Sequence, residues 1–250
     1  MAASGRDNHR SHERSSKQDR RARLAAERAA EARRERRRRI ALRGGLGAAA
    51  LALFGGVTAM AVTTTHSGSS PAAAAIPAQP RTTADGRTTA PPWDAPSGAA
   101  AAAAVRQAGL PMLTAEGTAL HLHAHLDVYV NGQAVPVPAD LGIDEQAGQV
   151  SPLHTHDGSG VIHVESPVQA DFTLGQFLTE WQVSTSADHL GGLRTDADHT
   201  LTAYVNGQAV SGDPAAITLH AHDEIALVYG TAADNARVSV PGSYAFPSGM

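Results

Sequence analysis

The sequence predicts an α+β domain in which a sheet packs on one helix, and two observations support this prediction. The first is an internal repeat, because the letters YVNGQAV occur at 129–135 and again at 204–210. The second is the hydrophobic period, which is that of strands around both copies and that of a helix between them. We therefore expect residues 105–232 to fold as two strand pairs separated by a helix.

The first copy of the repeat predicts a β-hairpin. Asn131-Gly132 lies between two alternating apolar segments, and this dipeptide suits a two-residue turn because both residues tolerate positive φ. The segments 121–130 and 133–139 are therefore expected to pair. The second copy, with the segment 223–230, supplies two further strands.

One helix is predicted within 171–181, because apolar residues recur there at i, i+3, i+4 and i+7, namely Leu174, Phe177, Leu178 and Trp181. Thr173 and Gln176 have the spacing of a capping box, and Phe172 can pack against Phe177 as a hydrophobic staple. The helix should begin at this cap and bury its apolar stripe.

The order strand, strand, helix, strand, strand resembles the ubiquitin-like β-grasp fold, and specifically the small sulfur carriers of thiamine and molybdopterin synthesis. The matching segments are VNGQAV, FTLGQFL, the second VNGQAV and HDEIALV. The resemblance implies a β-grasp-like fold with a histidine-rich insertion of about 35 residues before the helix. It does not imply sulfur transfer, because those carriers need a C-terminal Gly-Gly and Gly230 here is followed by further chain.

Charge is segregated along the chain. Residues 1–43 hold 15 of the 20 Lys and Arg but 6 of the 24 Asp and Glu, so they carry +9 and the remainder −13. The uncharged apolar segment 44–65 that follows has about the ~20 residues that a bilayer-spanning helix needs. We expect one transmembrane helix there, with a buried soluble helix as the alternative. A basic flank stays in the cytoplasm, so the C-terminal domain is expected outside the cell.

The N-terminal region allows two further interpretations. A basic run is also typical of a nucleic-acid-binding tail, but its position beside an apolar segment favours membrane topology, so no nucleic-acid partner is expected. The letters RRIALR and the small residues 59–61 leave open a cleaved export signal instead of an uncleaved anchor. Both alternatives export the same domain.

The other boundaries follow from composition. Residues 66–104 are rich in Ala, Pro, Thr, Ser and Gly, and this predicts a disordered or extended linker. Residues 233–250 lack a strong pattern and are expected to form a C-terminal tail or a short added strand.

Clustered histidines distinguish the domain, because six lie within 43 residues: His121, His123, His125, His154, His156 and His163. The first three alternate with apolar residues, so on a strand they share the face that points away from the core. The segments HLHAHLDVYVNG and HTHDGSGVIHVES together resemble a group of membrane-anchored or secreted prokaryotic proteins. This resemblance implies no particular activity.

Imidazole is a common ligand of Zn, Cu and Ni, and the chain has no cysteine and four Met. The six histidines therefore predict a divalent transition-metal site for Zn, Cu(II) or Ni. We expect the turn at 154–163 to bring its histidines against His123 and His125. Nothing in the sequence indicates a substrate, although Glu165 or Asp157 could activate a metal-bound water.

The alternative is a metal-free module of the cell envelope, in which a histidine-rich face binds a protein partner and responds to pH. His220 and His222 form a third small group for which the sequence indicates no role.

Overall fold

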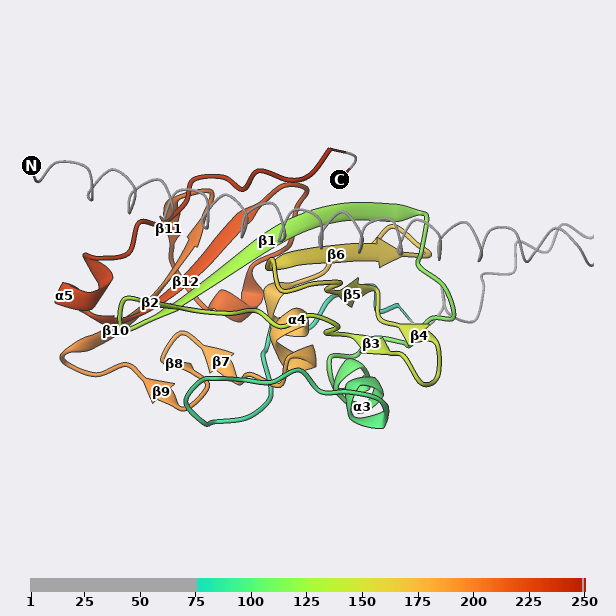
Figure 1. Ribbon diagram of the computed structural model, residues 1–250, viewed down its shortest axis with the longest axis horizontal. Helices are drawn as coiled ribbons and strands as arrows, with labels where there is room; N and C mark the ends of the chain where they lie inside the picture. The colour runs from blue at the N-terminus through green and yellow to red at the C-terminus, as the bar shows by residue number, and fades with distance from the viewer. Residues whose placement is uncertain (1–75, 249) are drawn as a thin grey trace, which may run out of the picture. The chain divides into compact units, whose positions relative to one another are not determined.

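The computed structural model describes residues 76–248 and 250, and these form an α+β fold around one mixed sheet (Figure 1). The predicted basic tail 1–43 and the predicted membrane segment 44–65 lie outside the described residues. Among the residues that are described, no helix has the length and apolar character needed to cross a membrane.

The main sheet has the order β11-β10-β12-β1-β6-β5, and β2 pairs with β1 beside this path. Its strands are β1 (Leu120–Val130), β2 (Gln133–Val135), β5 (Leu153–His154), β6 (Val161–Ser166), β10 (His199–Val205), β11 (Gln208–Val210) and β12 (Glu224–Thr231). Two small sheets contain β3 (Ile143–Asp144) with β4 (Gln149–Val150), and β7 (Thr185–Ser186) with β8 (His189–Leu190) and β9 (Leu193–Arg194). The helices are α3 (Ala99–Gln107), α4 (Leu174–Glu180), α5 (Ala232–Asn235) and the 3-10 helix η1 (Pro214–Ala216).

Both copies of the repeat form hairpins: the first was predicted, whereas the second was expected to form a single strand. β1 pairs with β2, and β10 pairs with β11, in both cases antiparallel. Asn131 and Gly132 have φ of 52° and 77°, and Asn206 and Gly207 have φ of 53° and 76°. Two successive residues with positive φ give the turn whose twist matches that of the flanking strands, which explains the repeated Asn-Gly.

The long strand β1 joins two parts of the sheet. Its second half, from His125 to Val130, pairs in parallel with β12, which also pairs antiparallel with β10. Its first half, from Leu120 to His125, pairs antiparallel with β6. The predicted histidine-rich insertion therefore extends the sheet through β6 and β5.

Helix α4 covers the face of the sheet that carries the apolar residues of β1 (Figure 1). Its capping box is confirmed, because the Thr173 side chain accepts from the Gln176 amide and the Gln176 side chain accepts from the Thr173 amide. Phe172, Phe177 and Trp181 are buried in one apolar core. The predicted stripe thus faces the sheet.

The predicted linker 66–104 differs from the structure, because residues 76–104 belong to the fold. Trp93 is 3% exposed and its ring meets that of Trp181 edge to face, with centroids 5.8 Å apart. The Trp181 indole N–H donates to the Trp93 carbonyl at 2.8 Å. Helix α3 begins at Ala99 and crosses the expected boundary at 105. One large aromatic ring and closely packed alanines supply the burial that composition alone did not indicate.

Replacing Trp181 by Ala should lower the free energy of unfolding by about 3–5 kcal/mol, because the ring is fully buried. Trp93→Ala should lower the free energy of unfolding by a similar amount, although the sequence predicts that Trp93 lies in a linker. Chemical denaturation of both single variants and the double variant should give a coupling free energy of about 0.5–3 kcal/mol. Val210→Ala, at an exposed site, is the control and should stay within about 0.5 kcal/mol. Purely additive losses would mean that the two rings stabilise the fold independently.

Candidate metal centre

A row of histidines crosses three neighbouring strands of the sheet. His123 of β1 lies directly opposite His163 of β6, and His163 lies opposite His154 of β5. Side chains that face each other across an antiparallel pair have Cβ atoms about 4.5–5.5 Å apart. The ring centroids are accordingly 4.6 Å apart for His123 and His163, and 5.2 Å apart for His154 and His163. Strand register alone brings these three imidazoles side by side.

His156 joins the row from the connection between β5 and β6. This connection turns tightly, because the Asp157 carboxylate accepts from the Ser159 amide at 2.9 Å and Gly160 adopts a φ of 88°. A Cβ on Gly160 would lie 2.6 Å from a carbonyl oxygen of β1, so the close approach requires glycine. The turn folds His156 back until its Nε2 lies 3.2 Å from Nε2 of His154.

At the other end of the row, the ring of His121 contacts His123 of the same strand and the carboxylate of Glu165. Its Nε2 lies 3.3 Å from Nε2 of His123 and 3.3 Å from Oε1 of Glu165. Glu165 is the residue opposite His121 in the pairing of β1 with β6. The structure therefore brings together five of the six predicted histidines, which we call the histidine cluster: His121, His123, His154, His156 and His163.

Two groups of donor atoms, drawn from the histidine cluster and Glu165, can hold a metal ion. One group is His154, His156 and His163, and the other is His121, His123 and Glu165; in each, the ligand atoms lie within 4.8 Å of one another. A third combination joins Glu116 and Glu165 to His154. Imidazole nitrogens and carboxylate oxygens are the ligands expected for a divalent transition metal in a site without thiolates.

The remaining nitrogen of His154 is fixed by the backbone. Its Nδ1 lies 3.0 Å from the Ser151 carbonyl oxygen, which can only accept, so Nδ1 carries the proton and Nε2 of the neutral ring offers a lone pair. The Ser151 hydroxyl in turn donates to Oε1 of Glu180 at 2.5 Å. Metal-binding histidines commonly have their second ring nitrogen fixed in this way.

Burial keeps the central imidazoles neutral. It lowers the pKa of His154 to about 3, assisted by the charges that His156 and His163 would carry. Burial and the neighbouring His163 and His121 lower the pKa of His123 to about 4. At neutral pH both rings therefore hold the free electron pair that a metal ion requires.

Glu165 is the buried carboxylate beside the histidine cluster. Burial alone would raise its pKa, but a hydrogen bond from His163 and the charges that His154 and His121 would carry lower the pKa below its ordinary value. Glu165, which is 5% exposed, is therefore ionised beside the neutral rings of His123 and His154. A buried negative charge beside several lone pairs favours a cation.

His125 lies apart from the histidine cluster, contrary to the expectation that it would share a site with His123. Its Nδ1 lies 2.7 Å from Oε2 of Glu224, the residue opposite it on β12, and its Nε2 lies 2.8 Å from the Ser159 carbonyl oxygen. Burial lowers the pKa of His125, but the hydrogen bond and charge of Glu224 outweigh this and raise it. With both nitrogens engaged, the ring offers no lone pair in this arrangement.

The histidine face of β1 is less open than expected. His123 and His125 are 5% and 4% exposed. The C-terminal chain, predicted as a tail, runs past β12 and β1 (Figure 1), and the Tyr244 ring stacks on His125 with centroids 3.8 Å apart. His222 contacts Phe246, and the exposed His220 pairs with Asp223 at 3.2 Å. Neither of these two histidines belongs to the donor groups found among the described residues.

Several residues of the site were missed by sequence reasoning. Glu116 lies 3.6 Å from Nε2 of His156, yet it precedes β1 in a segment without any pattern. Ser151 contacts Glu180 of α4, and Glu224 of β12 lies opposite His125. Both contacts join residues that are far apart in the sequence. The one available signal was Glu224, a charged residue at the start of an otherwise apolar strand.

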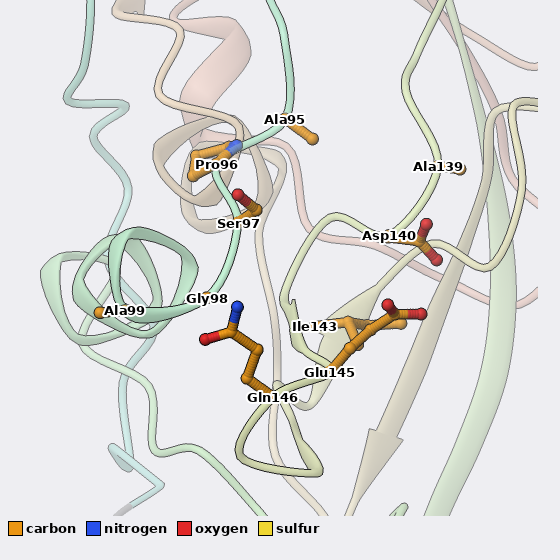
Figure 2. Close-up of a pocket in the computed structure, with 10 residues that line it drawn as sticks. All are labelled: Ala95, Pro96, Ser97, Gly98, Ala99, Ala139, Asp140, Ile143, Glu145 and Gln146. Carbon is orange, nitrogen blue, oxygen red and sulfur yellow. The ribbon is translucent and has the colours of Figure 1, made fainter.

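Figure 2 shows a pocket of about 410 Å³. It lies at the start of α3, and the side chains of Asp140, Glu145 and Gln146 line it. None of the described histidines lines it. Burial and the nearby Glu145 raise the pKa of Asp140. The pocket therefore has different chemistry from the histidine cluster.

No family model matches the chain, and no curated protein or solved structure is significantly similar to it. The histidine cluster is therefore interpreted from its own geometry.

Glu180→Gln should flatten the pH dependence of stability. Burial raises the pKa of Glu180 well above 4.5, and the hydrogen bond from Ser151 only partly opposes this. A raised pKa in the folded state stabilises the protein fully below pH 4.5, and this contribution is lost as the pH rises through the folded-state value. Relative to Glu180→Gln, the wild type should lose about 1.4 kcal/mol per pH unit within that window.

Denaturation at several pH values from 4.5 upward measures this difference. Asp94→Asn changes an exposed carboxylate and is the matched control, whose slope should equal that of the wild type. Parallel curves for wild type and Glu180→Gln would mean that Glu180 is ionised in the folded protein.

Proposed function

We propose that this protein binds a divalent transition-metal ion through His154, His156 and His163. The observation that supports the proposal is the approach of two imidazole nitrogens, Nε2 of His154 and Nε2 of His156, to 3.2 Å. Because Nδ1 of His154 is engaged with a carbonyl, its Nε2 presents a lone pair toward the second ring. A shared cation satisfies both nitrogens, and the strand register delivers His163 as the third ligand.

Zinc fits this spacing best. With Zn–N distances of 2.0–2.1 Å, two ligands at tetrahedral positions lie about 3.3 Å apart, whereas adjacent ligands in a square-planar site lie about 2.9 Å apart. The separation of 3.2 Å is closer to the tetrahedral value. Cu(II) and Ni(II) also accept imidazole ligands, so the choice of zinc rests on the geometry and not on the kind of donor.

The alternative of a metal-free interaction module has less support. A face that binds a protein partner must be accessible, whereas His154 is 0% and His163 is 4% exposed. A pH-sensitive face also needs histidines that titrate near neutrality, whereas burial lowers the pKa of His154 to about 3. These features favour a ligand set over a docking surface.

We also propose an export topology and a β-grasp-like fold. The charge of +9 over residues 1–43, next to the apolar segment 44–65, supports an extracytoplasmic location for the domain. The parallel pairing of β1 with β12, with β2 as the hairpin partner of β1 and β10 antiparallel to β12, is what supports the fold assignment. Neither assignment depends on metal binding.

Calorimetric titration of Zn(II) into the metal-free full-length chain at pH 7.5 should detect tight binding, and His154→Ala/His156→Ala should abolish the tight step. Co(II) used as a probe should show the intense visible bands of tetrahedral coordination. His154 should stay unprotonated and able to bind the ion below pH 6.5, the ordinary pKa of histidine, because its pKa is lowered to about 3.

His199→Ala is the matched control, because it removes a half-buried imidazole that pairs with Asp196 outside the histidine cluster. It should leave the titration unchanged. Equal affinity of wild type and the double variant would overturn the proposal and leave the interaction module as the better account.

The topology is tested separately by protease added to intact spheroplasts that produce the protein. An exported domain is digested from outside the cell, whereas a cytoplasmic one is protected until lysis. Protection would reverse the proposed location and leave the metal site unaffected.

A further inference from the structure

We propose that the histidine cluster holds two metal ions, the second bound by His121, His123 and Glu165. This inference rests on the proposed function, since the first ion is the one bound by His154, His156 and His163. The second ion would use His121, His123 and Glu165, which the first site leaves without a role.

The second group has the spacing of a metal site in its own right. Nε2 of His121 lies 3.3 Å from Nε2 of His123 and 3.3 Å from Oε1 of Glu165. Both distances match the ~3.3 Å edge of a tetrahedron around zinc. Two imidazoles and one carboxylate are also a ligand set that leaves the fourth position open.

One ion cannot use all the donors. Zinc takes four ligands, whereas the histidine cluster and Glu165 offer six groups. Two ligands of one ion at 2.0–2.1 Å lie at most about 4.2 Å apart. His154 lies on β5, whereas His121 and His123 lie on β1; these strands flank β6, so they are about 9–10 Å apart. Among the described donor groups, none combines His121 or His123 with His154 or His156.

Glu165 links the two proposed sites. Its Oε1 lies 3.3 Å from Nε2 of His121 and 3.4 Å from Nδ1 of His163. It can therefore bind the second ion while it orients His163, whose Nε2 then faces the first ion. Two dications near one shared carboxylate repel each other, so the second ion should bind more weakly than the first.

The two sites also differ in access to solvent. The side chain of His121 is 53% exposed, whereas His154 is 0% exposed. The second ion should therefore exchange with solvent and leave first when a chelator is added. The first ion should be retained longer because its ligands lie deeper in the sheet.

The test is zinc stoichiometry in the full-length protein, by calorimetry and by elemental analysis after gel filtration. Wild type should bind two ions per chain in two steps of decreasing affinity. His121→Ala, which changes an exposed ring, should remove the weaker step and keep the tight one. His154→Ala/His156→Ala should keep only the weaker step. Glu165→Gln should lose the weaker step and also weaken the tight one.

A second readout needs no substitution. Cu(II) loaded to two equivalents should give an electron paramagnetic resonance spectrum broadened by coupling between neighbouring ions, and one equivalent should not. His199→Ala is again the control, with two ions expected.

One ion per chain, bound as tightly in His121→Ala as in wild type, would overturn the second site and leave the proposed function intact. A single ion whose binding is lost in both His121→Ala and His154→Ala/His156→Ala would show that the groups form one site. Absence of any binding would instead refute the proposed function itself.

Discussion

The register of β5, β6 and β1 is the constraint on which the site depends. Because side chains alternate along a strand, a slip of one residue would move every histidine of β1 to the core side and expose its apolar residues. The register is held from the opposite face, where Ala124 and Leu126 of β1 and Ile162 of β6 are buried in the core. Apolar packing thus aligns His123 with His163 without any direct preference of one imidazole for another.

This alignment has an electrostatic consequence for the metal-free protein. The central imidazoles are held neutral, while the pKa of Glu165 is lowered, so a buried negative charge lies among lone pairs. A bound dication compensates that charge, and the free energy of binding then adds to the stability of the fold. The Glu180 carboxyl of α4 accepts from the hydroxyl of Ser151, whose carbonyl contacts His154, so one buried contact anchors the segment before β5 to the helix.

Local signals predicted the elements that they specify directly. The first Asn-Gly turn predicted the hairpin of β1 and β2, and the Thr173 cap with its apolar stripe predicted α4. The segment 76–98 could not be predicted in the same way, because its order depends on Trp93 meeting Trp181 from far along the chain. A segment rich in Ala, Pro and Thr shows low hydrophobicity whether or not it is packed, so composition alone gave the wrong assignment there.

The site shows the same limit at the level of single residues. His123 and His125 have equivalent positions in the HxHxH pattern, and the sequence gives no reason to separate them. Their cross-strand neighbours do, because His123 faces His163 of β6 whereas His125 faces Glu224 of β12. The Glu224 carboxylate lies 2.7 Å from Nδ1 of His125 and engages that nitrogen in a hydrogen bond. The role of each histidine on β1 therefore depends on its register: His123 lies where β1 pairs with β6, whereas at His125 the pairing with β12 begins on the opposite edge of β1.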